Sequence, residues 1–251
     1  MDLYLTRAID SVMHTIQLTE VGMCPRCWEN ELIAMQKICT ACYEAEEKQK
    51  RIDRIKASIV EELKKRGVRP KYLKCSFDNY ISCEKMKPII AEIASIDAGF
   101  VGSIFLTSKN SGTGKTHIAV ALMRKFLEAG IENIRFISSP FLFLEIKHSY
   151  GGSAEGKETT ERAIIERYCN YDVLIIDDIG VEKVSPWALQ IWYMIIDRRD
   201  SDLKTTVYTS NLSAGDIATH LDSRIASRIS AGLVYTFNCD DYRIIKRRRK
   251  S

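Results

Sequence analysis

The amino-acid sequence predicts an α/β fold, in which helices flank a central parallel sheet and a small cysteine-bearing, helical region comes first. From about residue 85 the chain alternates short apolar runs with segments of helical periodicity. The run 173–176 is apolar at every position, which is typical of a parallel strand buried on both faces. Two C-x-x-C pairs lie before this alternation, and they predict a small metal-stabilised segment.

Length and charge limit the classes of function. The 251 residues suffice for one large domain, or for a medium one with a small appendage. The net charge of +4 depends on the basic tail at 246–250, which is typical either of a nucleic-acid-binding arm or of a solvated chain end. No apolar run approaches the roughly 20 residues that a membrane span needs, and no secretory signal is visible. We expect a cytoplasmic protein.

The chain divides into four parts. We expect an N-terminal zinc-binding segment and helix at 1–66, a linker at 67–84, the main domain at 85–245 and a basic tail at 246–251. The helix lies within 43–66, and its apolar stripe is narrow enough to suit packing on one partner. The stripe consists of Ile52, Ile55, Ile59 and Leu63, and the helix ends at Gly67 and Pro70.

The elements of the main domain follow from the apolar runs and from turn residues. The predicted strands are 104–107, 134–137, 173–176, 205–208 and 234–237. The predicted helices are 117–128, 141–148, 161–169, 186–199 and 214–230. Gly130 closes the first helix, and Pro186 stands early in its helix, where proline is tolerated. We expect the last helix to be broken near Asp222.

A phosphate-binding loop follows the first predicted strand. Residues 111–116 match the second half of the pattern G-x-x-x-x-G-K-[ST], while Lys109 stands where the pattern has its first glycine. Gly112 and Gly114 let backbone N–H groups turn toward phosphate groups, and the helix that starts there directs its positive end at them.

The side chains of this loop predict an ATP site. Lys115 reaches the β- and γ-phosphates, and the hydroxyl of Thr116 ligates Mg²⁺. A buried strand before the loop and an amphipathic helix after it supply the required context. The predicted nucleotide-binding residues of the loop are Gly112, Thr113, Gly114, Lys115 and Thr116.

Polar residues follow two further strands. Asp177 and Asp178 end the strand at 173–176, and we expect Asp177 to hold the Mg²⁺ and Asp178 to polarise the attacking water. Asn211 follows the strand at 205–208, where its amide would orient that water. Arg224 and Arg228 lie four residues apart on one helical face, suited either to γ-phosphate charge in a neighbouring subunit or to simple solvation.

Taken together, these motifs resemble those of the DnaC-type bacterial replicative helicase loaders and the related IstB-like transposition ATPases, both of the AAA+ class. The similarity covers roughly residues 65–245. It rests on the stretches 65–70, 75–80, 111–117, 174–180, 196–199, 209–212 and 241–243. The resemblance implies an AAA+ P-loop NTPase fold with a central parallel sheet for the domain at 85–245.

The resemblance also implies roles and partners. Asn211 falls at the sensor-1 position, Arg243 resembles the sensor-2 arginine, and Arg228 is preferred over Arg224 as the arginine finger. Members of the family assemble as ATP-linked oligomers, bind single-stranded DNA and hold a ring helicase open. Asp178 stands where glutamate is commoner, and this shorter side chain would slow hydrolysis, as suits a switch.

The cysteine pairs are a strong signal for zinc. Cys24, Cys27, Cys39 and Cys42 have the spacing C-x2-C-x11-C-x2-C, which can close a tetrahedral zinc site and fits an iron–sulfur cluster less well. The N-terminal region contacts the helicase in loaders, so docking of that partner is favoured over contact with DNA. Ordinary structural roles are expected for Cys75, Cys83, Cys169, Cys239, His117 and His148, with these four cysteines buried.

The first hypothesis is therefore an ATPase that loads the replicative ring helicase. An IstB-like ATPase that assists a transposase would have the same core, although the cysteine-bearing segment and the linker favour the loader. A small-molecule P-loop kinase would need an acceptor site and a lid, and the paired arginines point away from it. A zinc-bearing DNA-binding module without turnover would not need Lys115.

Overall fold

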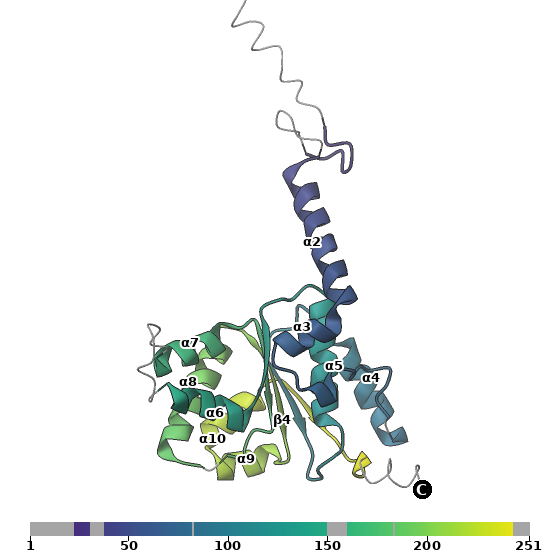
Figure 1. Cartoon of the computed structure of the whole chain (residues 1–251). Helices are drawn as coiled ribbons and strands as arrows, with labels where there is room; N and C mark the ends of the chain where they lie inside the picture. Colours follow the sequence, from purple (N-terminus) through teal and green to yellow (C-terminus); the bar gives the residue numbers. More distant parts are fainter. Residues whose placement is uncertain (1–22, 31–37, 82, 150–159, 183, 243–251) are drawn as a thin grey trace, which may run out of the picture. The chain divides into compact units, whose positions relative to one another are not determined.

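A computed structural model describes residues 23–30, 38–81, 83–149, 160–182 and 184–242 (Figure 1). The chain forms two compact units, Met1–Arg54 and Ile55–Ser251. The helices are α2 (Thr40–Ala57), α3 (Ile59–Lys65), η1 (Pro70–Tyr72), η2 (Glu84–Met86), α4 (Lys87–Ser95), α5 (Lys115–Glu128), α6 (Ser139–His148), α7 (Glu161–Asn170), α8 (Pro186–Ser201), α9 (Ala214–His220) and α10 (Ser223–Ile229). The strands are β1 (Ser103–Thr107), β2 (Ile134–Ser138), β3 (Val173–Asp177), β4 (Thr205–Ser210) and β5 (Leu233–Thr236).

The strands form one parallel sheet in the order β2-β3-β4-β1-β5. This confirms the predicted parallel sheet, and each predicted strand is present with bounds within two residues of those expected. Because β1 and β3 both pair with β4, their carboxyl ends lie together at one edge of the sheet. In open α/β sheets this edge is where ligands bind.

Alternate residues of each strand enter two different apolar cores. Val173 and Ile175 pack into a core with α3, α4 and α5, whereas Leu174 and Ile176 pack into one with α6, α7, α8, α9 and α10. The figure shows α4 and α5 on one side of the sheet and α6 to α8 on the other (Figure 1). Burial on both faces explains why the strand sequences are apolar without alternation.

Side-chain caps fix several helix ends. Thr160 and Ser185 accept N–H bonds at the starts of α7 and α8, and Ser213 forms a capping box with Asp216 at the start of α9. Asp222 accepts the N–H of Arg224 at 2.7 Å and so starts α10. The expected break near Asp222 is confirmed, and such caps each contribute about 1 kcal/mol.

Arg199 joins α8 to the sheet. Its side chain is fully buried, and burial lowers its pKa to about 10. The guanidinium donates hydrogen bonds to the oxygen atoms of Tyr168, Cys169, Tyr171, Thr205 and Thr206. Five donors in a rigid fork explain why arginine stands here in place of lysine.

The segment before the sheet differs in detail from the prediction. The single helix expected within 43–66 is two helices, α2 and α3, separated at Ser58. No proline or glycine marks this interruption, so the sequence pattern could not show it. The apolar stripe is present, since Ile55 and Leu63 are buried and Ile52 and Ile59 are half-buried. The expectation that it packs on a partner is wrong for Ile55, Ile59 and Leu63, which pack into the chain's own core. None of the helices described here has the length and apolar character that would cross a membrane.

The prediction for the cysteines outside the two C-x-x-C pairs is half right. Cys75 and Cys169 are buried thiols, as expected. The prediction for Cys83 and Cys239 is wrong, because they form a disulfide, with Cys83 exposed and Cys239 half-buried. The fold brings them together across 156 positions, a distance over which spacing in the sequence carries no signal.

Candidate functional site

A cavity of about 640 Å³ lies at the carboxyl edge of the sheet. Its volume is in the range of ordinary small-molecule sites. The lining residues come from the linker, the phosphate loop and the start of α5, the ends of β3 and β4, and the segment after β5: Lys71, Tyr72, Lys74, Cys75, Asn79, Tyr80, Ile81, Ser111, Gly112, Thr113, Gly114, Lys115, Thr116, His117, Asp178, Asn211 and Tyr242. Lys109, at the start of the loop, is exposed and is not among them.

The loop at 111–114 has the backbone of an anion cradle. Gly112 and Gly114 have φ values of +73° and +95°, which side-chain-bearing residues rarely adopt. A Cβ on Gly114 would also lie 2.4 Å from Cε2 of Tyr80. Helix α5 starts at Lys115, so its positive end points at the loop. Within the described chain, the buried hydroxyl of Thr113 has no hydrogen-bond partner. These features fit a phosphate group.

Lys115 and Asn211 meet at the floor of the cavity. Lys115 is only 6% exposed, and its Nζ donates to Oδ1 of Asn211 at 2.8 Å and to the carbonyl of Asn110 at 3.2 Å. The two side chains come from the loop after β1 and from the end of β4, which are neighbouring strands. The structure therefore brings together two residues that the sequence separates by 96 positions.

Asp177 is a buried carboxylate beside the loop. Its Oδ1 accepts the hydroxyl of Thr116 at 2.9 Å and that of Thr209 at 2.7 Å. Burial is the main cause that raises the pKa of Asp177 to about 6, and the neighbouring charge of Asp178 is the second cause. Asp178 is half-buried, lines the cavity and has a φ of +60°. The group formed by Thr116, Asp177 and Asp178 supplies the oxygen ligands that Mg²⁺ prefers.

Thr209 is a member of this site that sequence reasoning missed. Its hydroxyl donates to Asp177 and accepts the backbone N–H of Asp178 at 2.9 Å, so it holds the carboxylate of Asp177 and the main chain of Asp178. A signal was present: Ile176 pairs with Tyr208, so a polar residue after Tyr208 lies beside Asp177. Without knowledge of the register of β3 and β4, this neighbour could not be identified.

Replacing Asp177 with asparagine is expected to stabilise the nucleotide-free protein by about 1–3 kcal/mol at pH 8, since it removes a buried charge. The pKa is raised from 3.8 to about 6, so the folded state binds the proton more tightly than the unfolded state. The destabilisation of the wild-type protein by the ionised Asp177 therefore grows as the pH rises from about 4 to about 6, and it reaches its full size above that pH. Urea unfolding at pH 4.5 and pH 8 measures it.

The control for this experiment is Asp240→Asn, at an exposed position. The stability gain of Asp177→Asn should be larger at pH 8 than at pH 4.5, and the control should show no gain. An equal effect of Asp177→Asn at both values of pH would contradict the account of its burial.

Tyr80 and Tyr242 hold the loop from outside its own sequence. The hydroxyl of Tyr80 donates to the carbonyl of Thr113 at 2.8 Å, and the N–H of Tyr242 donates to the carbonyl of Gly112 at 3.0 Å. His117 has a structural contact, since its Nε2 bonds the carbonyl of Ser76 at 2.8 Å. The prediction for Arg243 falls outside the described residues. Tyr80 was predicted only as part of a linker.

The two predicted helix arginines do not line the cavity. Arg228 pairs with Asp197 of α8, and the guanidinium groups of Arg224 and Arg228 lie 5.2 and 5.3 Å from the ring centre of Tyr193. Arg224 has a 69% exposed side chain, against 27% for Arg228. Neither arginine therefore acts on this chain's own pocket in the arrangement described here.

The four cysteines of the predicted metal site lie together in the N-terminal unit. All four sulfur atoms lie within 4.8 Å of one another, and those of Cys27 and Cys39 are 3.8 Å apart. A tetrahedral ion with bonds of 2.3 Å needs a sulfur separation of about 3.8 Å, so the cluster fits such an ion. The N–H of Cys39 donates to Sγ of Cys24 at 3.3 Å and lowers the pKa of that thiol to about 6. The structure therefore brings together the four cysteines that the spacing singles out.

Comparison with known proteins decides the family. A family model described as IstB-like ATP binding protein matches residues 45–241, which include the whole sheet and every residue that lines the cavity except Tyr242. The chain belongs to the IstB-like ATP-binding protein family. The resemblance inferred from the sequence motifs is thereby confirmed.

This IstB-like protein is similar to the replicative helicase loader DnaC of Escherichia coli strain K12. The two are 30% identical over 222 residues, which is 85% of this chain and 86% of the relative. Among solved structures, the DnaC helicase loader covers 68% of this chain and 100% of its own, with 24% identity and a TM-score of 0.57. AMPPCP-bound DnaA from Aquifex aeolicus has 19% identity and a TM-score of 0.58, over 73% of this chain and 56% of its own. The fold is that of the AAA+ class.

Proposed function

We propose that this IstB-like protein is a cytoplasmic, ATP-dependent loader of the replicative ring helicase onto single-stranded DNA. The observation that carries the proposal is the pairing of Lys115 with Asn211 in a phosphate-binding pocket, in a chain similar to DnaC over 85% of its length. ATP binding and hydrolysis act as a switch for assembly with the helicase and release from it.

Different residues of the pocket have different roles in the binding and hydrolysis of ATP. Gly112, Thr113, Gly114 and Lys115 bind the phosphates, and Thr116 and Asp177 hold the Mg²⁺, which neutralises phosphate charge when it is bound. Asp178 polarises the attacking water, which the amide of Asn211 orients. Arg243 is proposed to contact the nucleotide from the end of the domain. The short side chain of Asp178 makes turnover slow, and DNA or the helicase regulates it.

ATP binds at the junction between two copies of the chain. Lys115, Thr116 and Asp177 belong to one subunit, and Arg228 reaches the γ-phosphate from the next, with Arg224 as the second choice. The contact of Arg228 with Asp197 supports this arrangement, because it holds the arginine on the surface of α8 and α10, outside its own pocket. Self-association therefore occurs through the ATPase domain.

The N-terminal region docks the helicase. Zinc bound by Cys24, Cys27, Cys39 and Cys42 stabilises a segment too short to build an apolar core of its own. Asn30 supports the metal site, since its Nδ2 lies 3.8 Å from Sγ of Cys27 and 3.7 Å from Sγ of Cys39. Such donors orient thiolate ligands. The basic tail at 246–250 adds phosphate contacts to DNA, which makes DNA binding sensitive to salt.

Purified full-length protein is expected to contain about one zinc ion per chain, as a four-thiolate site requires. Cys39→Ser should lose most of that zinc and should also lose helicase binding, because a three-thiolate site no longer closes the segment. Elemental analysis and a helicase pull-down measure the two effects. Cys169→Ala, which changes a buried thiol in the other compact unit, is the matched control and should keep both. Zinc-free protein that still binds helicase would contradict the role of the cluster.

A pull-down from the host with the full chain tests the whole proposal. It should retain a hexameric helicase, and the protein's ATPase activity should rise with single-stranded DNA in the absence of any phosphate acceptor. Retention of a transposase in place of a helicase would favour the alternative function, that of an IstB-like ATPase that assists a transposase. The description of the matching family, IstB-like ATP binding protein, is consistent with this alternative. Transfer of phosphate to a small molecule would instead indicate a P-loop kinase.

A further inference from the structure

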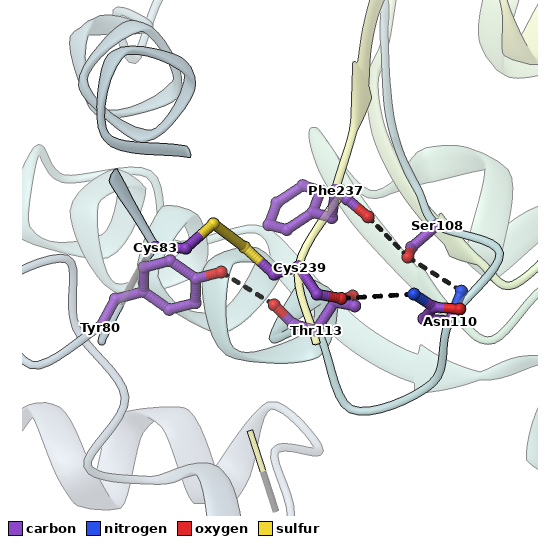
Figure 2. Close-up of a disulfide and its surroundings, with 7 residues drawn as sticks. All are labelled: Tyr80, Cys83, Ser108, Asn110, Thr113, Phe237 and Cys239. Atoms are coloured by element: carbon purple, nitrogen blue, oxygen red, sulfur yellow. Dashed lines mark hydrogen bonds between the residues drawn. A yellow bond between two sulfur atoms is a disulfide. The ribbon is translucent and has the colours of Figure 1, made fainter. Parts of the chain in front are cut away.

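We infer that Cys83 and Cys239 are a thiol pair whose oxidation by a hydroperoxide ties together two segments flanking the phosphate loop and so slows nucleotide release. The inference rests on the proposed function, since it concerns the same pocket. The Cα atoms of the two cysteines are 6.5 Å apart, within the range that a disulfide spans. Figure 2 shows the disulfide beside the loop.

The first flank is the linker that ends at Cys83. Tyr80, three residues earlier, places its ring against Gly114. Its hydroxyl donates to the carbonyl of Thr113 at 2.8 Å (Figure 2). Ile81 lines the cavity between Tyr80 and the cysteine. Any movement of Cys83 away from the loop therefore moves a wall of the nucleotide pocket.

The second flank is the segment that follows β5. The carbonyl of Phe237 accepts the hydroxyl of Ser108 at 2.7 Å, and the carbonyl of Cys239 accepts Nδ2 of Asn110 at 3.4 Å (Figure 2). Tyr242, three residues on, lines the cavity and bonds the carbonyl of Gly112 through its N–H. This flank thus follows the loop from its start to its central glycine.

The disulfide supplies the covalent link between these flanks. Each flank holds the loop by hydrogen bonds. Cys83, Asn238 and Asp240 in these flanks are exposed. Exposed segments of this kind open locally at a low cost in free energy. When both flanks are tied, Ile81 and Tyr242 separate less readily, and the nucleotide between the loop and these side chains leaves more slowly. The reduced form allows that opening.

The oxidation balances with a hydroperoxide as oxidant. The thiolate of the exposed Cys83 attacks one peroxide oxygen, the O–O bond breaks, and a sulfenic acid forms on Cys83 while water or an alcohol leaves. The thiol of Cys239 then attacks that sulfur, the S–S bond forms, and water leaves. The two thiols together lose two protons and two electrons, which reduce the peroxide. A dithiol reductant reverses the step by exchange.

Release of a fluorescent ATP analogue from the full-length protein tests the inference. The protein is treated with dithiothreitol or with hydrogen peroxide, and peptide mapping measures the linkage between Cys83 and Cys239. Oxidised wild-type protein should release the analogue on the order of tenfold more slowly, because local opening is suppressed. Dithiothreitol should restore the faster rate.

Two variants, Cys83→Ser and Cys239→Ser, provide the control. Both keep the four cysteines of the predicted zinc site, so any effect of oxidising those residues persists in them. The variants should release the analogue at the reduced wild-type rate under both treatments. Slower release in the oxidised variants, or equal rates in oxidised and reduced wild type, would overturn the redox inference alone. Reduced wild type that binds no analogue would overturn the ATP site and this inference with it.

Discussion

Replacing Lys115 with alanine is expected to lower the rate of ATP hydrolysis at least about 100-fold, since a positive charge aimed at the developing phosphate charge is lost. Lys115 is buried at the floor of the cavity, and its Nζ lies 2.8 Å from Oδ1 of Asn211. Phosphate release and binding of a fluorescent ATP analogue measure the effect.

Lys109→Ala is the matched control. Lys109 also belongs to the loop segment and carries the same charge, but it is exposed and does not line the cavity. Its replacement should leave hydrolysis within about twofold of wild type, as is usual for surface positions away from a site. Equal losses in the two variants would mean that general charge, and not the position of Lys115, controls activity.

Arg228→Ala is expected to reduce hydrolysis in the assembled state on the order of 1,000-fold while ATP still binds, as loss of an arginine finger does elsewhere. The reason is that Arg228 would contact the γ-phosphate of a neighbouring subunit and not its own. The same change also removes a partly exposed ion pair with Asp197, which contributes little to stability. Steady-state hydrolysis at high protein concentration measures the loss.

Mixing two inactive variants gives a sharper test of this role. Lys115→Ala subunits keep Arg228, and Arg228→Ala subunits keep Lys115, so some junctions in a mixed assembly contain both side chains. Hydrolysis should partly return on mixing. Asp197→Asn, which breaks the ion pair but keeps Arg228, should stay active. Arg228→Ala protein that hydrolyses ATP normally when assembled would refute the assignment.

Much of the ATP-binding unit could be predicted because its signals are local. The run 173–176 shows a strand buried on both faces, and a glycine-rich turn before Lys115 shows a phosphate loop whatever its tertiary contacts. The break at Asp222 was visible for the same reason, since a capping side chain acts within two residues. The four clustered cysteines were predictable from their paired spacing.

The features that could not be predicted depend on the pairing of distant segments. Thr209 joins the site only through the register of β4 against β3. Tyr80 holds the loop only because the linker folds back against Gly114. Cys83 and Cys239 form a disulfide because the segment after β5 passes beside that linker. Each of these contacts requires the tertiary fold, which no single motif encodes.

The central claim is that ATP at this pocket controls release of a ring helicase. The most direct measurement is the lifetime of the complex between the full-length protein and the host's replicative helicase on single-stranded DNA, with ATP and with a non-hydrolysable analogue. The complex should persist with the analogue and dissociate with ATP, and Asp178→Asn protein should hold the helicase under both conditions. Equal lifetimes for wild-type protein with either nucleotide would contradict the claim.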